Sequence, residues 1–137
     1  MPMPISESQT QQQIAVYLRL NYPNVMFHSD FGAGVHLTSR QAATQKRQNG
    51  GQRAWPDMFV AEPNKGYSGL FIELKREGTR LKRKDGKWAS PHLEEQAEVL
   101  DRLRFRGYKA EFACGFDEAR NLIDEYLKGE KGCDTIF

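Results

Sequence analysis

A short apolar segment, residues 69–75 with the sequence GLFIELK, constrains the fold of this chain more than any other feature. Successive residues of a strand point to opposite faces, so its aliphatic side chains share one face while Glu73 and Lys75 share the other with Phe71. A carboxylate and an ammonium therefore project side by side from an apolar strand. Burying charge is costly unless the charge is paired or bound to metal. The pattern indicates either a functional pair or a surface Glu–Lys pair on an edge strand.

The neighbouring segments predict a mixed α/β fold. Apolar periodicity and capping residues indicate helices at 6–22, 91–106 and 117–128, and strands at 25–28, 55–61, 69–75 and 108–114. Ser6 is a plausible N-cap, Pro91 fits a first helical turn, and Gly107 is a stop signal. Residues 30–54 form a long connection with room for a short helix at 39–48, and residues 79–88 read as a hairpin. The order α-β-β-β-α-β-α predicts a mixed β-sheet flanked by helices.

Length and composition predict one domain outside membranes. The 137 residues fit a single unit, with a core at about 6–128 and a flexible tail at 129–137. No apolar run reaches the ~18 residues of a spanning helix, and no secretory signal is visible at the start. Two cysteines make no disulfide framework. We therefore expect a reducing, cytoplasmic setting, in a bacterial or phage-infected cell, and no membrane partner.

Basic residues are clustered although the formal net charge is only +2. Residues 40–53 carry four basic side chains and no acid, residues 75–87 carry seven against two acids, and a third basic cluster lies at 102–109. Such faces attract a phosphate backbone, although a solvated surface is the alternative for any one cluster. The candidate DNA-binding residues are Arg40, Lys46, Arg47, Arg53, Arg80, Lys82, Arg83, Lys84 and Lys87.

A second carboxylate precedes the neighbouring strand, where Pro56 and Asp57 lead into an apolar run. Asp57 and Glu73 on adjacent strands, with Lys75 two residues further on, suit a hard divalent cation. Mg²⁺ prefers oxygen ligands and keeps several waters, so two carboxylates and a backbone carbonyl suffice. A metal ion lowers the pKa of a bound water and neutralises charge that builds up on a phosphate. Lys75 would then orient that water.

The same residues resemble a known family. Pro56-Asp57, a spacer of 15 residues and Glu73-Leu74-Lys75 are similar to the signature of the PD-(D/E)XK nuclease superfamily. From about residue 7 to residue 127 the chain resembles small phage-type VRR-NUC domains. The shared order is a Gln-rich helix, a Gly- and Arg-bearing loop into Pro-Asp, LFIELK, a helix carrying a glutamine, then a strand and a helix. The resemblance implies a restriction-endonuclease-like fold.

The resemblance also implies roles for individual residues. Asp57 and Glu73 correspond to the metal-binding carboxylates, the backbone carbonyl of Leu74 to a further ligand, and Lys75 to the catalytic lysine. Arg53 resembles a basic position in the loop before the Pro-Asp strand and would contact the scissile phosphate, or merely the DNA backbone.

Two further candidates have plain structural alternatives. Gln96 corresponds to the family glutamine, but an inward-facing glutamine can also serve only to bond buried backbone. Glu7 corresponds to the acidic residue of the first helix and would assist the metal directly or through water, yet an acid at a helix start can simply complement the helix dipole. Both are predicted as catalytic residues.

The function implied is a Mg²⁺-dependent DNA endonuclease, with Mn²⁺ able to substitute, that leaves a 3′-hydroxyl and a 5′-phosphate. Its substrate would be branched or double-stranded DNA in phage replication or repair, and it would act as a homodimer. Three alternatives stay open: a sequence-specific restriction-like endonuclease, a non-catalytic DNA-binding module, and an accessory subunit of a replication or packaging complex.

The three histidines and two tryptophans are predicted to be structural. His28, His36 and His92 are widely spaced and show no metal-ligand spacing. Trp55 and Trp88 lie near expected strand ends, where aromatic side chains usually pack, although both can stack on bases.

Overall fold

A computed structural model describes residues 5–30 and 37–128. The predicted tail at 129–137 and His36 lie outside the described residues. Eight elements follow in the order α1 (Glu7–Asn21), β1 (Phe27–Ser29), α2 (Ser39–Gln48), β2 (Met58–Val60), β3 (Leu70–Lys75), α3 (Pro91–Phe105), β4 (Lys109–Cys114) and α4 (Phe116–Leu127). Within the described ranges, no helix combines the length and apolar character needed to cross a bilayer.

The four strands form one mixed sheet in the order β1-β2-β3-β4. β2 pairs antiparallel with both β1 and β3, whereas β3 and β4 run parallel and are connected through α3. This confirms the predicted mixed sheet with helices around it. The register pairs Met58 with Ile72, which sets the residue before Met58 level with Glu73.

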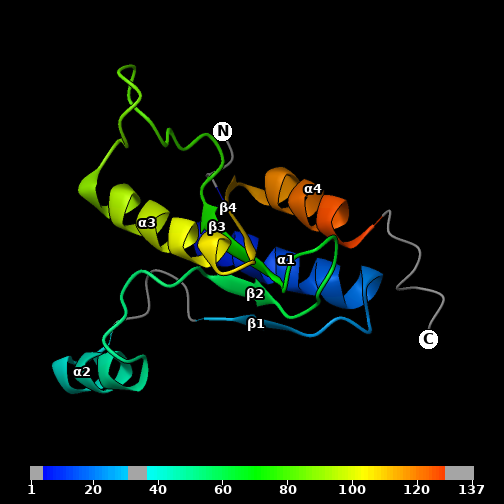
Figure 1. Cartoon of the computed structure of the whole chain (residues 1–137), viewed down its shortest axis with the longest axis horizontal. Helices are drawn as coiled ribbons and strands as arrows, with labels where there is room; N and C mark the ends of the chain where they lie inside the picture. The colour runs from blue at the N-terminus through cyan, green and yellow to red at the C-terminus, as the bar shows by residue number, and fades with distance from the viewer. Residues whose placement is uncertain (1–4, 31–36, 129–137) are drawn as a thin grey trace.

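The apolar core lies between one face of the sheet and helices α1 and α4 (Figure 1). The aliphatic residues of β3 point into it, as strand alternation predicts, and meet Ile14 and Leu18 of α1 and Ile123 of α4. These aliphatic side chains are fully buried, and β3 is an interior strand of the sheet. The surface Glu–Lys alternative for β3, which assumed an edge strand, is therefore wrong, because β2 and β4 flank it on both sides.

The opposite face of the sheet carries α3 and a group of aromatic side chains. The rings of Phe59 and Phe71 stack at 4.4 Å between centroids, and Trp55 lies 6.2 Å from Phe71. α3 packs against β4 and leaves this aromatic group at its side. Glu73 and Lys75 project from this face, so they lie outside the main apolar core.

Two predicted boundaries differ from the structure for backbone reasons. β2 begins at Met58 rather than at residue 55, because Pro56 has no N–H to donate and Ala54 adopts a left-handed conformation with φ of 59°. β1 is likewise short and ends where the N–H of Asp30 donates to the carbonyl of Asp57. The chain before β2 is therefore a fixed bend and leaves Asp57 just outside the strand.

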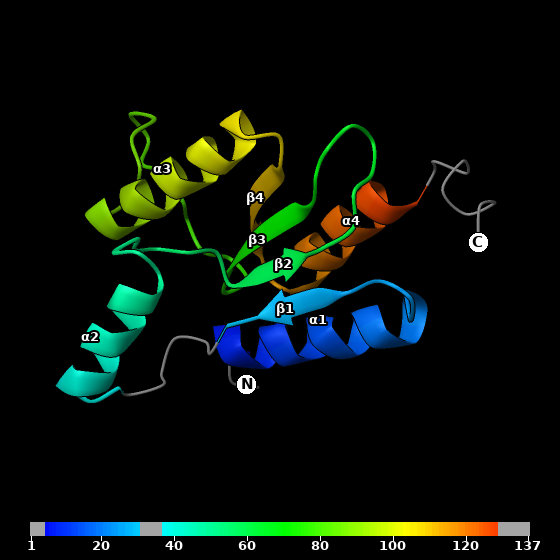
Figure 2. The ribbon, with the colours of Figure 1, turned by 60° about the horizontal axis from the view of Figure 1, so that its bottom comes forward.

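Two basic segments project from the body at the end where α3 begins (Figures 1 and 2). α2 has no buried residue, and the side chain of Thr38 caps it. The predicted hairpin is present: the N–H of Arg83 donates to the carbonyl of Lys87, and Lys82 pairs with Trp88. Both segments are held mainly by their own hydrogen bonds.

Candidate functional site

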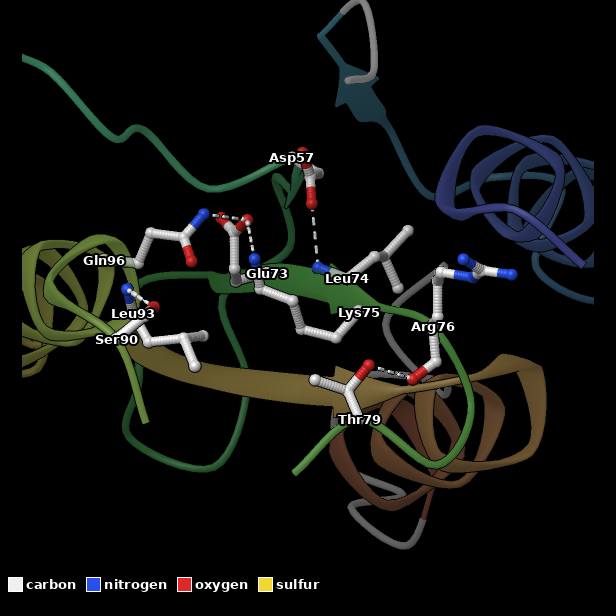
Figure 3. A network of polar contacts seen from close by, with 9 residues as sticks. All are labelled: Asp57, Glu73, Leu74, Lys75, Arg76, Thr79, Ser90, Leu93 and Gln96. Carbon is white, nitrogen blue, oxygen red and sulfur yellow. Dashed lines mark hydrogen bonds and ion pairs between the residues drawn. The ribbon is translucent and has the colours of Figure 1, made fainter. Parts of the chain in front are cut away.

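Glu73 and Lys75 lie together and are almost fully enclosed at the end of β3. Their residues are 3% and 8% exposed, and Lys75 Nζ lies 3.9 Å from Glu73 Oε1. Figure 3 shows both side chains on one side of the strand, with Gln96 and Asp57 around them. The separation is too long for a direct hydrogen bond, so the pair is close but incompletely satisfied.

Asp57 reaches the same place from the start of β2. Its Oδ2 accepts a hydrogen bond of 2.8 Å from the backbone N–H of Leu74 (Figure 3). In a strand the N–H and C=O of one residue face the same neighbour, so the Leu74 carbonyl also lies on the Asp57 side of β3. The side chains at 57, 73 and 75 converge, together with the backbone group predicted as a ligand.

Gln96 completes the group from α3. The side chain of Ser90 caps this helix, and one turn later Gln96 Nε2 donates to Glu73 Oε1 over 2.8 Å. The partner of this buried amide is a site carboxylate, so the alternative in which Gln96 only bonds backbone is not supported. Glu73 Oε2 and Gln96 Oε1 are buried without a hydrogen-bond partner among the described residues.

Burial and like charge strongly perturb both carboxyl groups. Burial, followed by the negative charge of Asp57, raises the pKa of Glu73 to about 9, against a smaller opposing effect of Lys75. Burial also raises the pKa of Asp57, although the hydrogen bond from Leu74 opposes it. Two carboxylates that compete in one enclosed site favour a shared cation or a retained proton.

Glu7 lies at the rim of the same cavity. This cavity measures about 790 Å³ and is lined by Glu7, Asp57, Glu73, Lys75 and Gln96, among other residues. Glu7 is also the acidic residue of the first turn of α1, so its dipole role remains compatible with the structure. Within the described residues no three His, Cys, Asp or Glu side chains come close enough to hold a metal. Glu7 therefore lines the same cavity as Asp57 and Glu73 but does not form a three-carboxylate metal site with them.

The predicted basic residues divide between the cavity and the projecting segments. Arg53 and Lys46 line the cavity, and Arg53 Nη2 lies 3.7 Å from Glu95. The others are exposed on α2 and the hairpin, away from the carboxylates: Arg40, Arg47, Arg80, Lys82, Arg83, Lys84 and Lys87. Lys82 lies 4.7 Å above the ring of Trp88, which packs on Phe112 as predicted.

Sequence reasoning missed three residues around the site. Gln11 is buried in α1, and its Nε2 donates to the carbonyl of Asp30 at 2.6 Å and to that of Asp57 at 3.4 Å. Gln11 thereby fixes the backbone that carries Asp57. Its signal was a polar residue on the core-facing stripe of α1. Asp30 and His92 line the cavity, and His92, predicted to be structural, is exposed there.

Comparison with known proteins identifies the fold. A solved structure described as a "VRR_NUC domain protein" superposes with a TM-score of 0.68 at 21% sequence identity and covers 92% of this chain and 91% of that chain. No family model matches the sequence. A search of curated proteins also finds no match. The fold is therefore that of a VRR-NUC domain, as the sequence resemblance predicted.

Proposed function

We propose that this protein is a metal-dependent nuclease that hydrolyses phosphodiester bonds of DNA. The observation that carries the proposal is the convergence of Asp57, Glu73, Lys75 and Gln96 in one cavity, with two carboxyl groups whose charge is poorly compensated by the protein. The structural likeness to a VRR_NUC domain protein supports the same class of function.

The donor set fits a hard divalent cation such as Mg²⁺ or Mn²⁺. Glu73 Oε2 is buried and has no hydrogen-bond partner in the part of the chain that the structure describes. Asp57 and Glu73 supply carboxylate oxygens, and the Leu74 carbonyl lies on the Asp57 side of β3. These three would hold the ion, with waters completing its shell. When bound, the cation would supply Lewis-acid stabilisation of the phosphate and a more acidic water.

The remaining residues act on the reaction through position and charge. Gln96 Nε2 holds the Glu73 carboxylate in place through Oε1, and Oε2 has no hydrogen-bond partner among the described residues. Lys75, enclosed beside Glu73, would orient the attacking water and stabilise negative charge near it. Gln11 and the Leu74 N–H fix Asp57 from two sides. Preorganised groups of this kind need little rearrangement during reaction.

The projecting basic segments supply the DNA contacts in this proposal. α2 and the hairpin carry exposed cations at the end of the molecule where α3 begins, and Lys46 and Arg53 extend that charge into the cavity. Contacts of this type neutralise phosphates without reading bases. We therefore propose a preference set by DNA shape, with branched DNA as the first substrate to test, in a reducing, cytoplasmic setting. A homodimer remains a prediction.

The test is cleavage of linear, nicked, flapped and four-way DNA, with Mg²⁺, with Mn²⁺ and with EDTA. We expect metal-dependent cleavage that Asp57→Asn and Lys75→Met each reduce by at least about 100-fold, because each removes a group that stabilises the transition state. Glu77→Gln, two residues beyond Lys75 and exposed, is the matched control and should retain full activity.

DNA affinity measured in EDTA separates the proposal from its alternatives. Lys75→Met should still bind DNA within a few-fold of the unsubstituted protein, because the phosphate contacts lie elsewhere. Binding without cleavage of any substrate in either metal would instead indicate a DNA-binding module. The absence of both binding and cleavage would reject a nucleic-acid function.

A further inference from the structure

A second cavity adjoins the carboxylate site and has a different chemical character. It measures about 420 Å³ and lies between the end of α3 and the bend before β2. Trp55, Val99, Leu103 and Phe105 make its apolar walls. Gln52 and Trp55 line both cavities, so the two are neighbours.

The aromatic walls of this cavity are unusually exposed. Phe105 is 83% exposed and Trp55 is 41% exposed. The ring of Trp55 lies beside that of Phe71, with centroids 6.2 Å apart and the planes tilted by 39°. Trp55 therefore differs from the predicted packed aromatic, because one part of its ring is held while the rest faces solvent. Exposed aromatic rings are the surfaces on which nucleobases stack.

The rim of the cavity is positively charged. Arg102 and Arg106 line it, and neither has a carboxylate partner within ion-pair distance among the described residues. Asp101, the one acid among the described residues that line this cavity, accepts a 2.6 Å hydrogen bond from Arg104, which offsets its charge. Arg102 Nη1 donates to Gln52 Oε1, which orients the guanidinium toward the bend before β2. An anionic ligand such as a phosphate is favoured here over a basic or neutral protein surface.

We propose that this cavity binds one unpaired nucleotide of the DNA, its base stacking on Trp55 and Phe105 and its phosphate meeting Arg102 and Arg106. A base inside a duplex has both faces covered, so only an unpaired or displaced base can use such a platform. The inference rests on the proposed function and deepens it: the protein selects DNA that has an unpaired nucleotide beside the cleavage position.

The test measures binding without cleavage, in EDTA, so that it does not depend on catalysis. A duplex and the same duplex with a short single-stranded tail are titrated against the protein, and the ratio of their affinities is compared between variants. Trp55→Ala should lower that ratio roughly 5- to 150-fold, the range for losing one base–aromatic stack. Trp55→Phe should retain most of the ratio. Leu20→Ala, a 75% exposed apolar residue on α1, is the control and should leave it unchanged.

A second variant and a fluorescence measurement distinguish a loss of base binding from a folding defect. Phe105→Ala removes a highly exposed ring and should also lower the ratio, with an unchanged unfolding curve. The sequence has two tryptophans, so in a Trp88→Phe background the fluorescence reports Trp55 alone, and tailed DNA should quench it more than duplex does. Equal losses for both DNAs, or no change, would overturn the proposal. The proposal would also be overturned if both cavity variants lost self-association but kept their DNA affinity, because the cavity would then be a protein contact.

Discussion

Glu73→Gln removes the charge that the site compensates least. In the metal-free protein, burial and the nearby Asp57 raise the pKa of Glu73 from 4.5 to about 9. Between these pH values the unfolded chain has lost the proton while the folded chain retains it. The folded state therefore binds more protons, and stability falls as pH rises through this window.

The size of the effect follows from the shift. Each pH unit inside the window costs about 1.4 kcal/mol, so at about pH 7.5 the penalty is on the order of 4 kcal/mol. A glutamine mimics the protonated acid at every pH. Without metal, Glu73→Gln should therefore match the unsubstituted protein near pH 4.5 and exceed its stability at pH 7.5 by up to that amount, roughly 10 °C in Tm.

Urea unfolding in EDTA at several pH values measures the difference between the two proteins. The difference in unfolding free energy between the two proteins removes the contribution of the titrating groups that both share. Added Mn²⁺ should stabilise the unsubstituted protein, because metal replaces the retained proton, and should stabilise Glu73→Gln far less. Glu77→Gln is the exposed control and should change stability by less than about 0.5 kcal/mol at each pH. A stability difference that does not grow with pH, or a destabilised Glu73→Gln at pH 7.5, would refute this reasoning.

Three further substitutions test the residue that holds Asp57, the turn before α4 and the basic hairpin. Gln11→Leu should lower the unfolding free energy by about 1 kcal/mol, because the part-buried hydrogen bond from Gln11 to the Asp30 carbonyl is lost; it should also slow DNA cleavage at least about 10-fold by releasing Asp57, as steady-state rates will show. Gly115→Ala should cost about 1–3 kcal/mol in a urea titration, because its φ is 92° and a Cβ there would lie 3.0 Å from Glu77 Cβ. Replacing Lys84 and Lys87 together by alanine should reduce the salt dependence of DNA binding by a slope of about 2, since each lost phosphate contact removes about 0.9. Unchanged slopes would exclude the hairpin from the DNA interface.

The sequence predicted the sheet, the helices around it and the convergence at positions 57, 73 and 75. These follow from local signals: strand alternation in residues 69–75, the cap at Ser6, the stop at Gly107 and a short apolar run after Asp57. Such signals are carried by a few adjacent residues, so they can be recognised without the fold.

What the sequence did not predict depends on contacts between distant segments. The 2.6 Å hydrogen bond from Gln11 to Asp30 joins residues 19 positions apart, and the bend at Ala54 that shortens β2 is a left-handed backbone conformation unusual for alanine. The exposure of Trp55 likewise depends on where α3 ends relative to the bend before β2. The hydrogen bond, the bend and the exposure of Trp55 each arise from tertiary packing, which overrides the conformational preference of the local sequence.

The central claim is that the oxygen atoms of Asp57, Glu73 and Leu74 form one cation site. Anomalous diffraction from a crystal soaked in Mn²⁺ tests it directly, with Glu73→Gln crystals treated identically as the control. We expect one peak bounded by the two carboxylates and the Leu74 carbonyl, and its loss in the variant. A fully occupied peak elsewhere in the cavity, with these three oxygens uninvolved, would contradict it.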